Sequence, residues 1–400
     1  MNIKSISLSS AAAFLGISGA QAAPTVPSEV EPVKYMRACD AYGKGYFYIP
    51  GTETCIRLSG NVRSDLTAGD DVDAKTSADL DGIDRTYAAA SRLTLVLQTA
   101  SETELGTLRS YARFYSQWSN GKDKAGAKLS AAYIELGGFR VGLDETIFDS
   151  WTGGYGNVIN DDNIAPAGVT RTNFISYTFS GEGGFSAIIG AELGNASGPD
   201  PKGLYYYINK NGQLADISDG DLVPPSKQVK NYIPNLLIGA KFMQKWGGFS
   251  TIAAYDYHYK KWGGKLRVDF NVNDKLNLWV MGGYKNNIDY YKKENDTLSR
   301  QSTAIYANWG GKWATWAGAT YKIAPQADFN AQVSYSAVKT FATSLNISYT
   351  LTPGLKITPE LTYVSWNDNR TFDGSDGSTA KHALNGRSAL QGMIRIQRSF

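Results

Sequence analysis

Charged side chains gather in two parts of this chain, and the two groups carry opposite signs. Acids cluster within residues 144–162, at Asp144, Glu145, Asp149, Asp161 and Asp162. Arginines recur in the earlier part, at Arg57, Arg63, Arg92, Arg109 and Arg113, with Arg140 nearby. Like charges on neighbouring strands repel one another and cost stability, so the arginines need acidic partners. The chemistry that these residues indicate is electrostatic.

Signals for catalysis or metal binding are weak. The only two histidines are His258 and His382, and both fall in expected loops. A hydrolase would need a Ser–His or Asp–His set placed at one rim, and no such spacing is visible, although residues distant in the chain can still meet in a fold. Two cysteines and two distant histidines are too few ligands for a zinc site. The sequence therefore indicates no enzyme, no metal and no cofactor.

The N-terminus has the three regions of a secretory signal peptide. Lys4 precedes a short apolar run, and the small residues around Ala22 end it, so we expect cleavage after residue 22. The run is too short to cross a bilayer as a helix. Cys39 and Cys55 would then meet an oxidising compartment, where a close pair is expected to form a disulfide, the alternative being two buried thiols.

Composition favours an all-β chain without a nucleic-acid partner. Removing the signal peptide removes Lys4 and no acid, so the net charge falls from +3 to +2. A nucleic-acid partner would require a strong basic bias. The mean hydropathy is −0.31, yet the chain has 25 Tyr, 15 Phe and 9 Trp together with 42 Gly. Abundant aromatic residues at modest hydropathy fit an all-β protein and the aromatic girdles of a transmembrane barrel.

Apolar and polar side chains alternate along segment after segment. In "SRLTLVLQT" Leu93, Leu95 and Leu97 share one face, and Arg92, Thr94 and Gln98 share the other. Each such segment has about the ten residues that a tilted strand needs to cross a membrane. The pattern has exceptions, because Ile188, Trp279 and Met393 fall on the polar side.

The connections between these segments alternate between short and long. Short ones include Gly137-Gly138 and "TPG", whereas long ones run near residues 66–87, 145–171, 194–233, 285–311 and 366–387. This alternation predicts a transmembrane antiparallel β-barrel with short periplasmic turns and long extracellular loops. The count is about 16 strands if "YANWGG" belongs to a loop. A soluble β-sandwich or propeller is the alternative architecture.

The last segment, "ALQGMIRIQRSF", alternates up to the terminal Phe400. Closing a sheet into a barrel pairs the last strand with the first, so this strand is expected to complete the barrel. A terminal Phe on such a strand resembles the signal that outer-membrane proteins present to the barrel assembly machinery, although Arg398 stands where that signal often has an aromatic residue.

Several motifs resemble those of alphaproteobacterial porins. They are "CDAYGKGYFYIPGTETCIRLSGNVR", "GGFRVGLDE", "NVINDD" and "SYTFSGEGGFSA", and the similarity extends over the mature chain. The resemblance implies a homotrimer of 16-stranded barrels in the outer membrane, surrounded by lipid and lipopolysaccharide. It also implies that the third long loop folds into each lumen. The acids of residues 144–162 would then face the arginines of the early strands across water and create a transverse field.

The resulting prediction has three parts: a signal peptide (1–22), a periplasmic segment holding the Cys39–Cys55 disulfide (23–54), and the barrel (55–400). We expect a water-filled pore for the passive diffusion of small hydrophilic solutes and ions. Two alternatives remain, namely a surface-structural or adhesive barrel with a blocked lumen and a solute-specific channel. An aromatic track along the lumen wall would favour the latter.

Overall fold

A computed structural model of the protein describes most of the mature chain. The described residues are 37–74, 80, 87–120, 122–123, 126–153, 156–166, 171–193, 205–208, 214–216, 232–257, 260–286, 289–294, 297–301, 306–369, 371–373 and 379–400. The predicted signal peptide, residues 23–36 of the predicted periplasmic segment, and His258 lie outside this set. Ala38–Phe400 is one of the two units into which the chain divides, and it contains the barrel.

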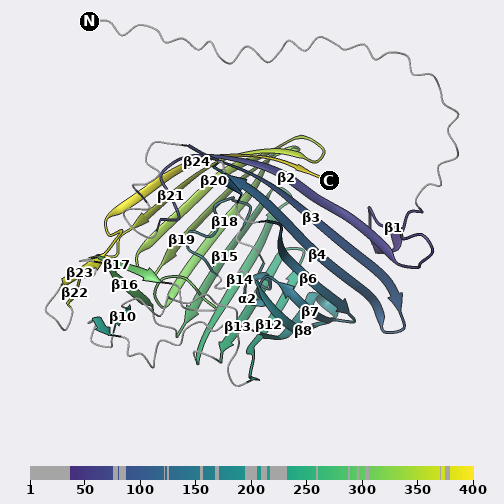
Figure 1. Ribbon diagram of the computed structural model, residues 1–400, viewed down its shortest axis with the longest axis horizontal. Helices are drawn as coiled ribbons and strands as arrows, with labels where there is room; N and C mark the ends of the chain where they lie inside the picture. Colours follow the sequence, from purple (N-terminus) through teal and green to yellow (C-terminus); the bar gives the residue numbers. More distant parts are fainter. Residues whose placement is uncertain are drawn as a thin grey trace, which may run out of the picture. The chain divides into compact units, whose positions relative to one another are not determined.

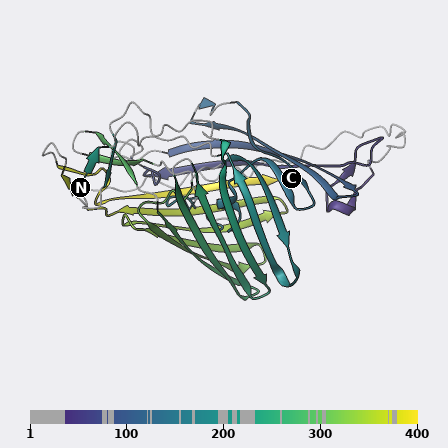
Figure 2. The ribbon, with the colours of Figure 1, turned by 90° about the horizontal axis from the view of Figure 1, so that it is seen from below.

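The described strands form a closed antiparallel barrel of 16 strands, as predicted. Each strand pairs with its neighbours in chain order, from the purple β2 to the yellow β24 (Figures 1 and 2). The barrel strands are β2 (Cys55–Gly69), β3 (Tyr87–Thr103), β4 (Gly106–Ser119), β6 (Lys128–Leu136), β7 (Phe139–Asp144), β8 (Thr172–Ser180), β9 (Phe185–Glu192), β12 (Asn235–Gln244), β13 (Gly247–Asp256), β14 (Lys261–Asn273), β15 (Leu276–Lys285), β18 (Trp313–Ala324), β19 (Ala327–Ser336), β20 (Thr340–Thr352), β21 (Leu355–Trp366) and β24 (Arg387–Ser399).

The barrel closes where the last strand meets the first. β24 pairs with β2 from Asn61↔Ser399 to Gly69↔Gln391. Beyond this ladder, the Gly60 amide donates to the Phe400 carbonyl at 2.9 Å, and the Phe400 amide donates to the Gly60 carbonyl at 3.0 Å. Closure leaves no sheet edge exposed to lipid, which is what a membrane-spanning sheet requires. The segment "YANWGG" (306–311) lies in a loop between strands, as the predicted count of 16 strands required.

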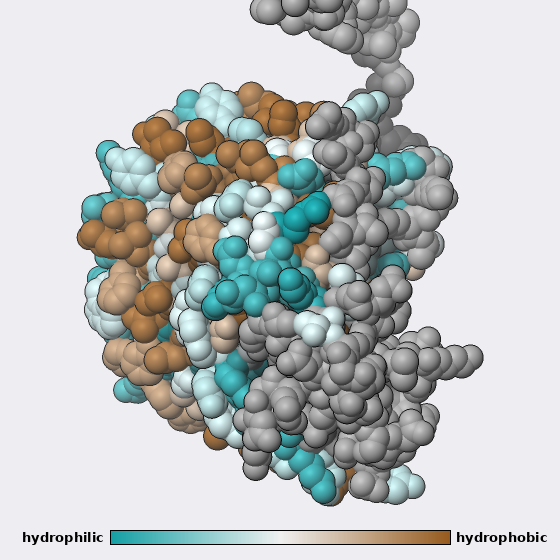
Figure 3. Space-filling model, turned by 90° about the vertical axis from the view of Figure 1, so that its left-hand side faces the viewer, coloured by the Kyte–Doolittle hydropathy of each residue, from teal (hydrophilic) through white to brown (hydrophobic). Residues whose placement is uncertain are grey.

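The two faces of the barrel wall differ in polarity as the alternation predicted. Leu93, Leu95 and Leu97 point outward and are 41%, 37% and 39% exposed. The buried side chains of the same wall point inward. Figure 3 shows hydrophobic residues (brown) gathered over one side of the face that it presents. None of the helices among the described residues is long and apolar enough to cross a membrane.

Short turns and long loops lie at opposite ends of the strands. The two-residue turn Gly137-Gly138 joins β6 to β7, and both of its residues have positive φ, +55° and +93°. Such angles favour glycine, and they match the twist of a tight hairpin. At the other end, the loops are numbered in chain order, short ones included, starting from the loop between β2 and β3. Strand-like pieces of the fourth loop (between β9 and β12), the sixth (between β15 and β18) and the eighth (between β21 and β24) form a second, 6-stranded sheet. Its strands are β10 (Tyr205–Ile208), β11 (Leu214–Asp216), β16 (Tyr290–Glu294), β17 (Thr297–Gln301), β22 (Thr371–Asp373) and β23 (Thr379–His382).

The segment before the barrel is fixed to the start of β2. Cys39 and Cys55 form a disulfide, which confirms the predicted pair. Both cysteines are buried and pack with Tyr46 and with Ala100 of β3. The short strand β1 (Phe47–Tyr48) pairs with the first residues of β2. The disulfide therefore holds residues 39–55 against the turn end of the first two barrel strands.

Candidate functional site

The third loop, residues 145–171 between β7 and β8, folds toward the inward-facing side chains of the barrel wall. Its only described helix is α2 (Ile147–Ser150), which begins after Thr146. Beyond α2 the loop hydrogen-bonds to inward-facing residues of β18, β19, β20 and β21, far along the chain. These strands carry their large apolar residues outward, for example Val333 and Leu361. The loop therefore lies against the inner wall, as the resemblance implied.

The start of the loop is held by the buried carboxylate of Glu192, at the end of β9. The Thr146 hydroxyl donates to Glu192 Oε2 at 2.8 Å, and the Ile147 amide donates to Oε1 at 2.6 Å. The phenol of Tyr306, in the sixth loop, donates to Oε2 at 2.8 Å. Glu192 is 0% exposed, and a buried carboxylate is tolerated when several donors satisfy it. One carboxylate thus joins β9, the third loop and the sixth loop.

The middle of the loop is held by a second buried carboxylate, Glu360 of β21. It accepts hydrogen bonds from the amide of Ile159 and, at 2.7 Å, from that of Asn160. Asn346 of β20 donates to the same carboxylate at 2.9 Å. Hydrogen bonds to an ionised acceptor are about twice as strong as neutral ones. Glu360 therefore satisfies two loop amides that would otherwise lack a partner inside the barrel.

A row of inward-facing polar side chains completes the attachment of the loop. These residues belong to β18, β19 and β20 and bond mainly to loop carbonyls, which a loop without regular structure leaves unpaired. The bonds are Trp316 Nε1 to Ile164 O at 2.8 Å, Gln332 Nε2 to Asp161 O at 2.8 Å, Ser344 Oγ to Asn160 O at 2.9 Å, Asn346 Nδ2 to Asn157 O at 2.9 Å, and Asn157 Nδ2 to Thr320 Oγ1 at 3.0 Å.

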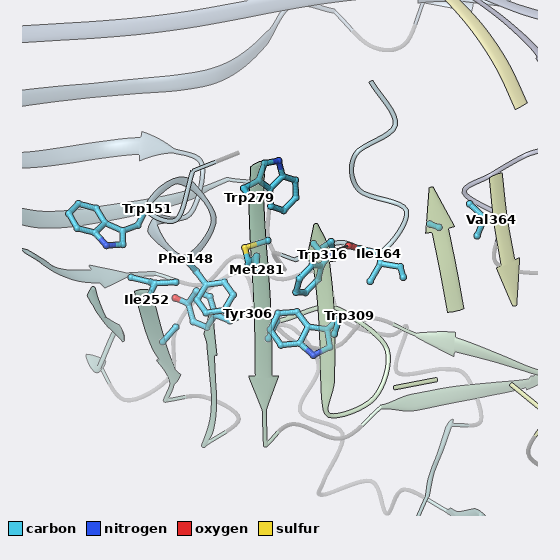
Figure 4. Close-up of a cluster of buried hydrophobic side chains, with 14 of the residues drawn as sticks. Phe148, Trp151, Ile164, Ile252, Trp279, Met281, Tyr306, Trp309, Trp316 and Val364 are labelled. Atoms are coloured by element: carbon cyan, nitrogen blue, oxygen red, sulfur yellow. Dashed lines mark hydrogen bonds between the residues drawn. The ribbon is translucent and has the colours of Figure 1, made fainter. Parts of the chain in front are cut away.

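Apolar side chains of the loop pack against large apolar side chains of the inner wall and into the space beside a wall glycine. Figure 4 shows Phe148 and Trp151 of the loop in one cluster with Trp279, Met281 and Trp316 of the wall. A Cβ at Gly239 would lie 2.6 Å from Trp151 Nε1, so the indole occupies the space that glycine leaves. Ile188 and Trp279 belong to this cluster. Their apolar character at inward positions is thereby explained, because they meet the loop and not water.

The sixth loop also contributes to this inner packing through residues 306–311. Tyr306, Ala307 and Trp309 are 4%, 1% and 0% exposed. The Trp309 ring meets Trp316 edge-on with centroids 5.5 Å apart, and Tyr306 lies 5.5 Å from Phe148 (Figure 4). The third loop is therefore packed between the barrel wall and a segment of the sixth loop, which we call the brace (residues 306–311).

The predicted charged residues separate into distinct groups, the first on the wall formed by β4, β6 and β7. Arg113 Nη2 lies 3.1 Å from Glu145 Oε1 and 3.7 Å from Asp144 Oδ1. Arg140 pairs with Asp144 and lies 3.3 Å from Glu135. Asp144 and Glu145 are thus brought together with Arg113 and Arg140 as neighbours on one wall.

A second group lies at the seam of the barrel. Arg395 of β24 binds Asp65 of β2 in a bidentate manner, at 2.6 and 2.9 Å. Arg63 Nε lies 3.4 Å from the same carboxylate, and Arg63 is paired directly with Arg92 in the ladder. Arg92 donates to Gln117 at 2.6 Å. Two guanidinium groups, those of Arg63 and Arg395, therefore share the Asp65 carboxylate, and the neighbouring Arg92 bonds to a neutral amide.

Arg57 and Arg109 form a third group near the turn end. Arg57 lies over the ring of Tyr46, 5.7 Å from its centroid, and Arg109 lies 5.9 Å from that of Tyr42. Both tyrosines belong to the disulfide-closed segment, so these arginines make cation–π contacts in place of ion pairs among the described residues.

The acids of the third loop differ in their surroundings. Asp149 lies 3.6 Å from the ammonium group of Lys265 on β14, whose side chain is 1% exposed. Asp161 and Asp162 form no ion pair with any described lysine or arginine. Burial, followed by the charge of Asp162, raises the pKa of Asp161 to about 7. Burial likewise raises the pKa of Asp162, with a smaller contribution from Asp149. The middle of the loop thus carries carboxyl groups that form no ion pair with a described lysine or arginine.

Four residues that organise this region escaped the sequence analysis as site residues: Glu192, Glu360, Lys265 and Arg395. Arg395 stands on the polar face of the last strand, and this position alone predicts that its side chain faces the lumen. Glu360 in "KITPELTYV" likewise stands on a polar phase, yet nothing in its own segment links it to residues 159–160. These roles depend on contacts between distant parts of the chain.

The barrel is closed and antiparallel, its inner wall is polar, its outer wall is apolar, and a loop lies in its lumen. These features define a membrane channel of the outer-membrane type. The chain belongs to the porin family: residues 24–393 match the family model described as "Porin subfamily". It is an outer-membrane channel for passive diffusion, as predicted. Membership of this family favours a channel over an enzyme.

Individual porins and outer-membrane channels are similar to this chain in sequence or in fold. The chain is 39% identical to "Porin Omp2b" of Brucella suis over 417 residues, which cover 100% of both chains. Its fold resembles that of the outer membrane channel DcaP of Acinetobacter baumannii, with a TM-score of 0.57, 15% identity, and coverage of 88% of this chain and 99% of that one. It also resembles an anion-selective porin from Comamonas acidovorans, with a TM-score of 0.53, 14% identity, and coverage of 87% and 100%.

Replacing the Glu360 carboxylate tests how the loop is held. In Glu360→Gln the loop amides lose a charged acceptor, and hydrogen bonds to charged groups contribute about 1.5–3 kcal/mol. We expect a folded barrel whose single-channel current is noisier than that of the wild type, because the loop moves more. Glu182→Gln, which neutralises an exposed acid in a short turn, is the matched control. Equal noise in both variants would contradict the anchoring role.

Proposed function

We infer that the third loop and the arginines of the barrel seam form the two sides of the pore constriction. The acidic side is formed by Asp149, Asp161 and Asp162, and the basic side by Arg63 and Arg92, joined by Arg395. The observation that carries the proposal is the local charge imbalance. Asp161 and Asp162 form no ion pair with a described lysine or arginine, whereas Arg63 and Arg395 share the single carboxylate of Asp65 and Arg92 beside them bonds to the neutral Gln117.

The remaining predicted residues have related roles in this proposal. Asp144, Glu145, Arg113 and Arg140 form a paired polar wall beside the constriction, which hydrated solutes pass. Arg57 and Arg109 line the approach from the turn end. A field directed from arginines to carboxylates orders water across the pore, so a polar solute can align with it, whereas an apolar solute must displace ordered water. The proposal assigns no enzyme activity and no cofactor to the chain.

The proposal also includes the assembly and surroundings of the protein. We expect a homotrimer embedded in lipid and lipopolysaccharide and inserted by the barrel assembly machinery, which the terminal Phe400 would engage. The family supports the trimer, and so does the outer surface of β9, β12 and β13. An apolar hollow there is floored by small residues such as Ala187, Ala240 and Ala253, against which another apolar surface can pack.

The alternatives differ in what the lumen does. A structural or adhesive barrel with a blocked lumen would conduct no ions, and its surface would be the 6-stranded loop sheet. A solute-specific channel would bind its solute inside the lumen. Tyr111 and Tyr133 stack on the inner wall with centroids 4.8 Å apart, and Arg140 covers Tyr133 at 3.7 Å. This stack is short and partly covered, so we favour general diffusion.

Liposome swelling tests the transport function. Proteoliposomes should swell in isotonic solutions of small sugars without an energy source, because a polar lumen passes hydrated solutes. Swelling should slow as the sugar grows from a monosaccharide to a trisaccharide. Vesicles that remain impermeable at high protein content would support the blocked-barrel alternative.

Paired substitutions test the two sides of the constriction. Asp161→Asn with Asp162→Asn should shift ion preference toward anions, and Arg63→Gln with Arg92→Gln should shift it toward cations. Both shifts should shrink in molar salt, where the Debye length is only about 3 Å. Reversal potentials across a KCl gradient measure the preference. If both double variants conduct with unchanged reversal potentials, the constriction is formed by other residues.

Ion preference should also depend on pH near neutrality. The raised pKa of Asp161, about 7, means that its carboxyl group gains a proton as the pH falls through that value. The loop then loses negative charge, so preference for cations should fall between about pH 8 and pH 6. Asp161→Asn should remove most of this dependence. A wild-type reversal potential that is flat over this range would contradict the assignment.

Assembly can be measured directly. Native mass spectrometry in mild detergent should give three times the mass of the mature chain, in agreement with slow migration of unboiled samples. A predominant monomer under the same conditions would count against the trimer.

A further inference from the structure

A cavity of about 320 Å³ lies at the long-loop ends of the strands, beside the third loop. Its walls include Asp73 of the first loop, Asp162 and Asn163 of the third loop, and Asn308 and Trp309 of the brace. The ends of β20 and β21 add Thr340 and Trp366, and Arg300 of β17 and His382 of β23 also line it. A volume of this size is at the lower end of the range for sites that bind small molecules.

The cavity offers both hydrogen-bond acceptors and donors. Asp162 has no ion pair with a described lysine or arginine, and Asp73 accepts from Asn163 at 3.1 Å. On the other side, the indole Nε1 of Trp309 is buried and has no hydrogen-bond partner among the described residues. A buried N–H without a partner costs free energy, which a bound acceptor or water would recover. The walls therefore suit a ligand that both donates and accepts.

Charged and titratable groups of both kinds lie in the cavity walls. Arg300 and His382 line the cavity; Arg300 Nη2 donates to the Asn308 carbonyl at 3.1 Å, and its Nη1 lies 3.8 Å from Asp289. Asp289 is itself shared with Lys285, at 3.2 Å. Asp73 and Asp162 contribute two carboxylates to the same walls, so the lining carries no excess of positive charge that would select an anion. A simple ammonium ion would meet the carboxylates but would leave the Trp309 N–H unused, because an ammonium group has no acceptor.

The cavity walls are fixed rather than loosely arranged. The Trp316 indole donates to the carbonyl of Ile164, which lines the cavity, and the brace packs on the same Trp316. Trp366, 8% exposed, and Val338, also 8% exposed, provide apolar surface among the polar groups. Fixed polar groups lower the ordering cost of binding.

We propose that this cavity binds a small neutral polyhydroxylated solute, of the size of a monosaccharide, as the solute enters the channel from the loop side. Its hydroxyl groups would donate to the carboxylates and accept from the indole N–H, and its C–H face would lie on the apolar part of the wall. The proposal rests on the diffusion function, to which it adds a weak, saturable site.

The probe is glucose, added to single channels in planar bilayers bathed in KCl. Glucose should cause reversible current fluctuations that saturate with concentration. Asn308→Ala with Thr340→Val removes two polar cavity side chains that do not anchor the third loop, and it should raise the apparent Kd about tenfold. Thr343→Val, on the outward phase of β20, is the matched control and should leave the Kd unchanged. The heat-induced electrophoretic shift verifies that each variant is folded.

Several outcomes would overturn the proposal. They are the absence of glucose fluctuations in channels that conduct KCl normally, an unchanged Kd in the folded double variant, and tighter binding of lysine or glutamate than of glucose. In each case the diffusion function would stand. A folded wild-type protein that conducts no KCl would instead overturn the diffusion function, and this proposal with it.

Discussion

Every backbone N–H and C=O group within the barrel must find a partner, and this constraint shapes the protein at two levels. In the wall, closure meets it, because the last strand pairs with the first as far as the mutual bonds of Gly60 and Phe400. Inside the wall, the third loop has no strand to pair with. Two buried carboxylates, Glu192 and Glu360, and a row of inward amide and hydroxyl groups supply its partners. The position of the loop follows from these bonds.

The same bonds connect the third loop to the sixth loop. Tyr306 shares Glu192 with the start of the third loop, and the rest of the brace packs on Trp316 and Gly283. The brace follows β17, a strand of the 6-stranded loop sheet. Part of the sixth loop thus belongs to the extracellular surface and part to the inner packing. An inner cluster of this kind explains why large apolar residues occupy some inward positions.

The electrostatics of the lumen depend on which charges have local partners. Arg113 and Arg140 are matched by acids on the same wall, so their fields decay over short distances. Asp161 and Asp162 lie in a loop whose anchors are themselves acidic or neutral, and neither forms an ion pair with a described lysine or arginine. Burial without a counter-charge raises the pKa of both carboxyl groups. The sequence did not distinguish the paired acids (Asp144 and Glu145) from the unpaired ones (Asp161 and Asp162), since all of them lie within residues 144–162.

The sequence alone determined the barrel, its strand count, the alternation of turns and loops, and the disulfide between Cys39 and Cys55. These features depend on periodicity and on local turn residues, which each segment carries by itself. Resemblance to porins added the inward third loop. The tertiary structure alone decided that Glu360 meets residues 159–160, that Arg395 joins Arg63 at the seam, and that Tyr306 reaches Glu192. Such pairs join residues that lie far apart in the chain, and their formation depends on how the closed barrel and its loops bring distant side chains together.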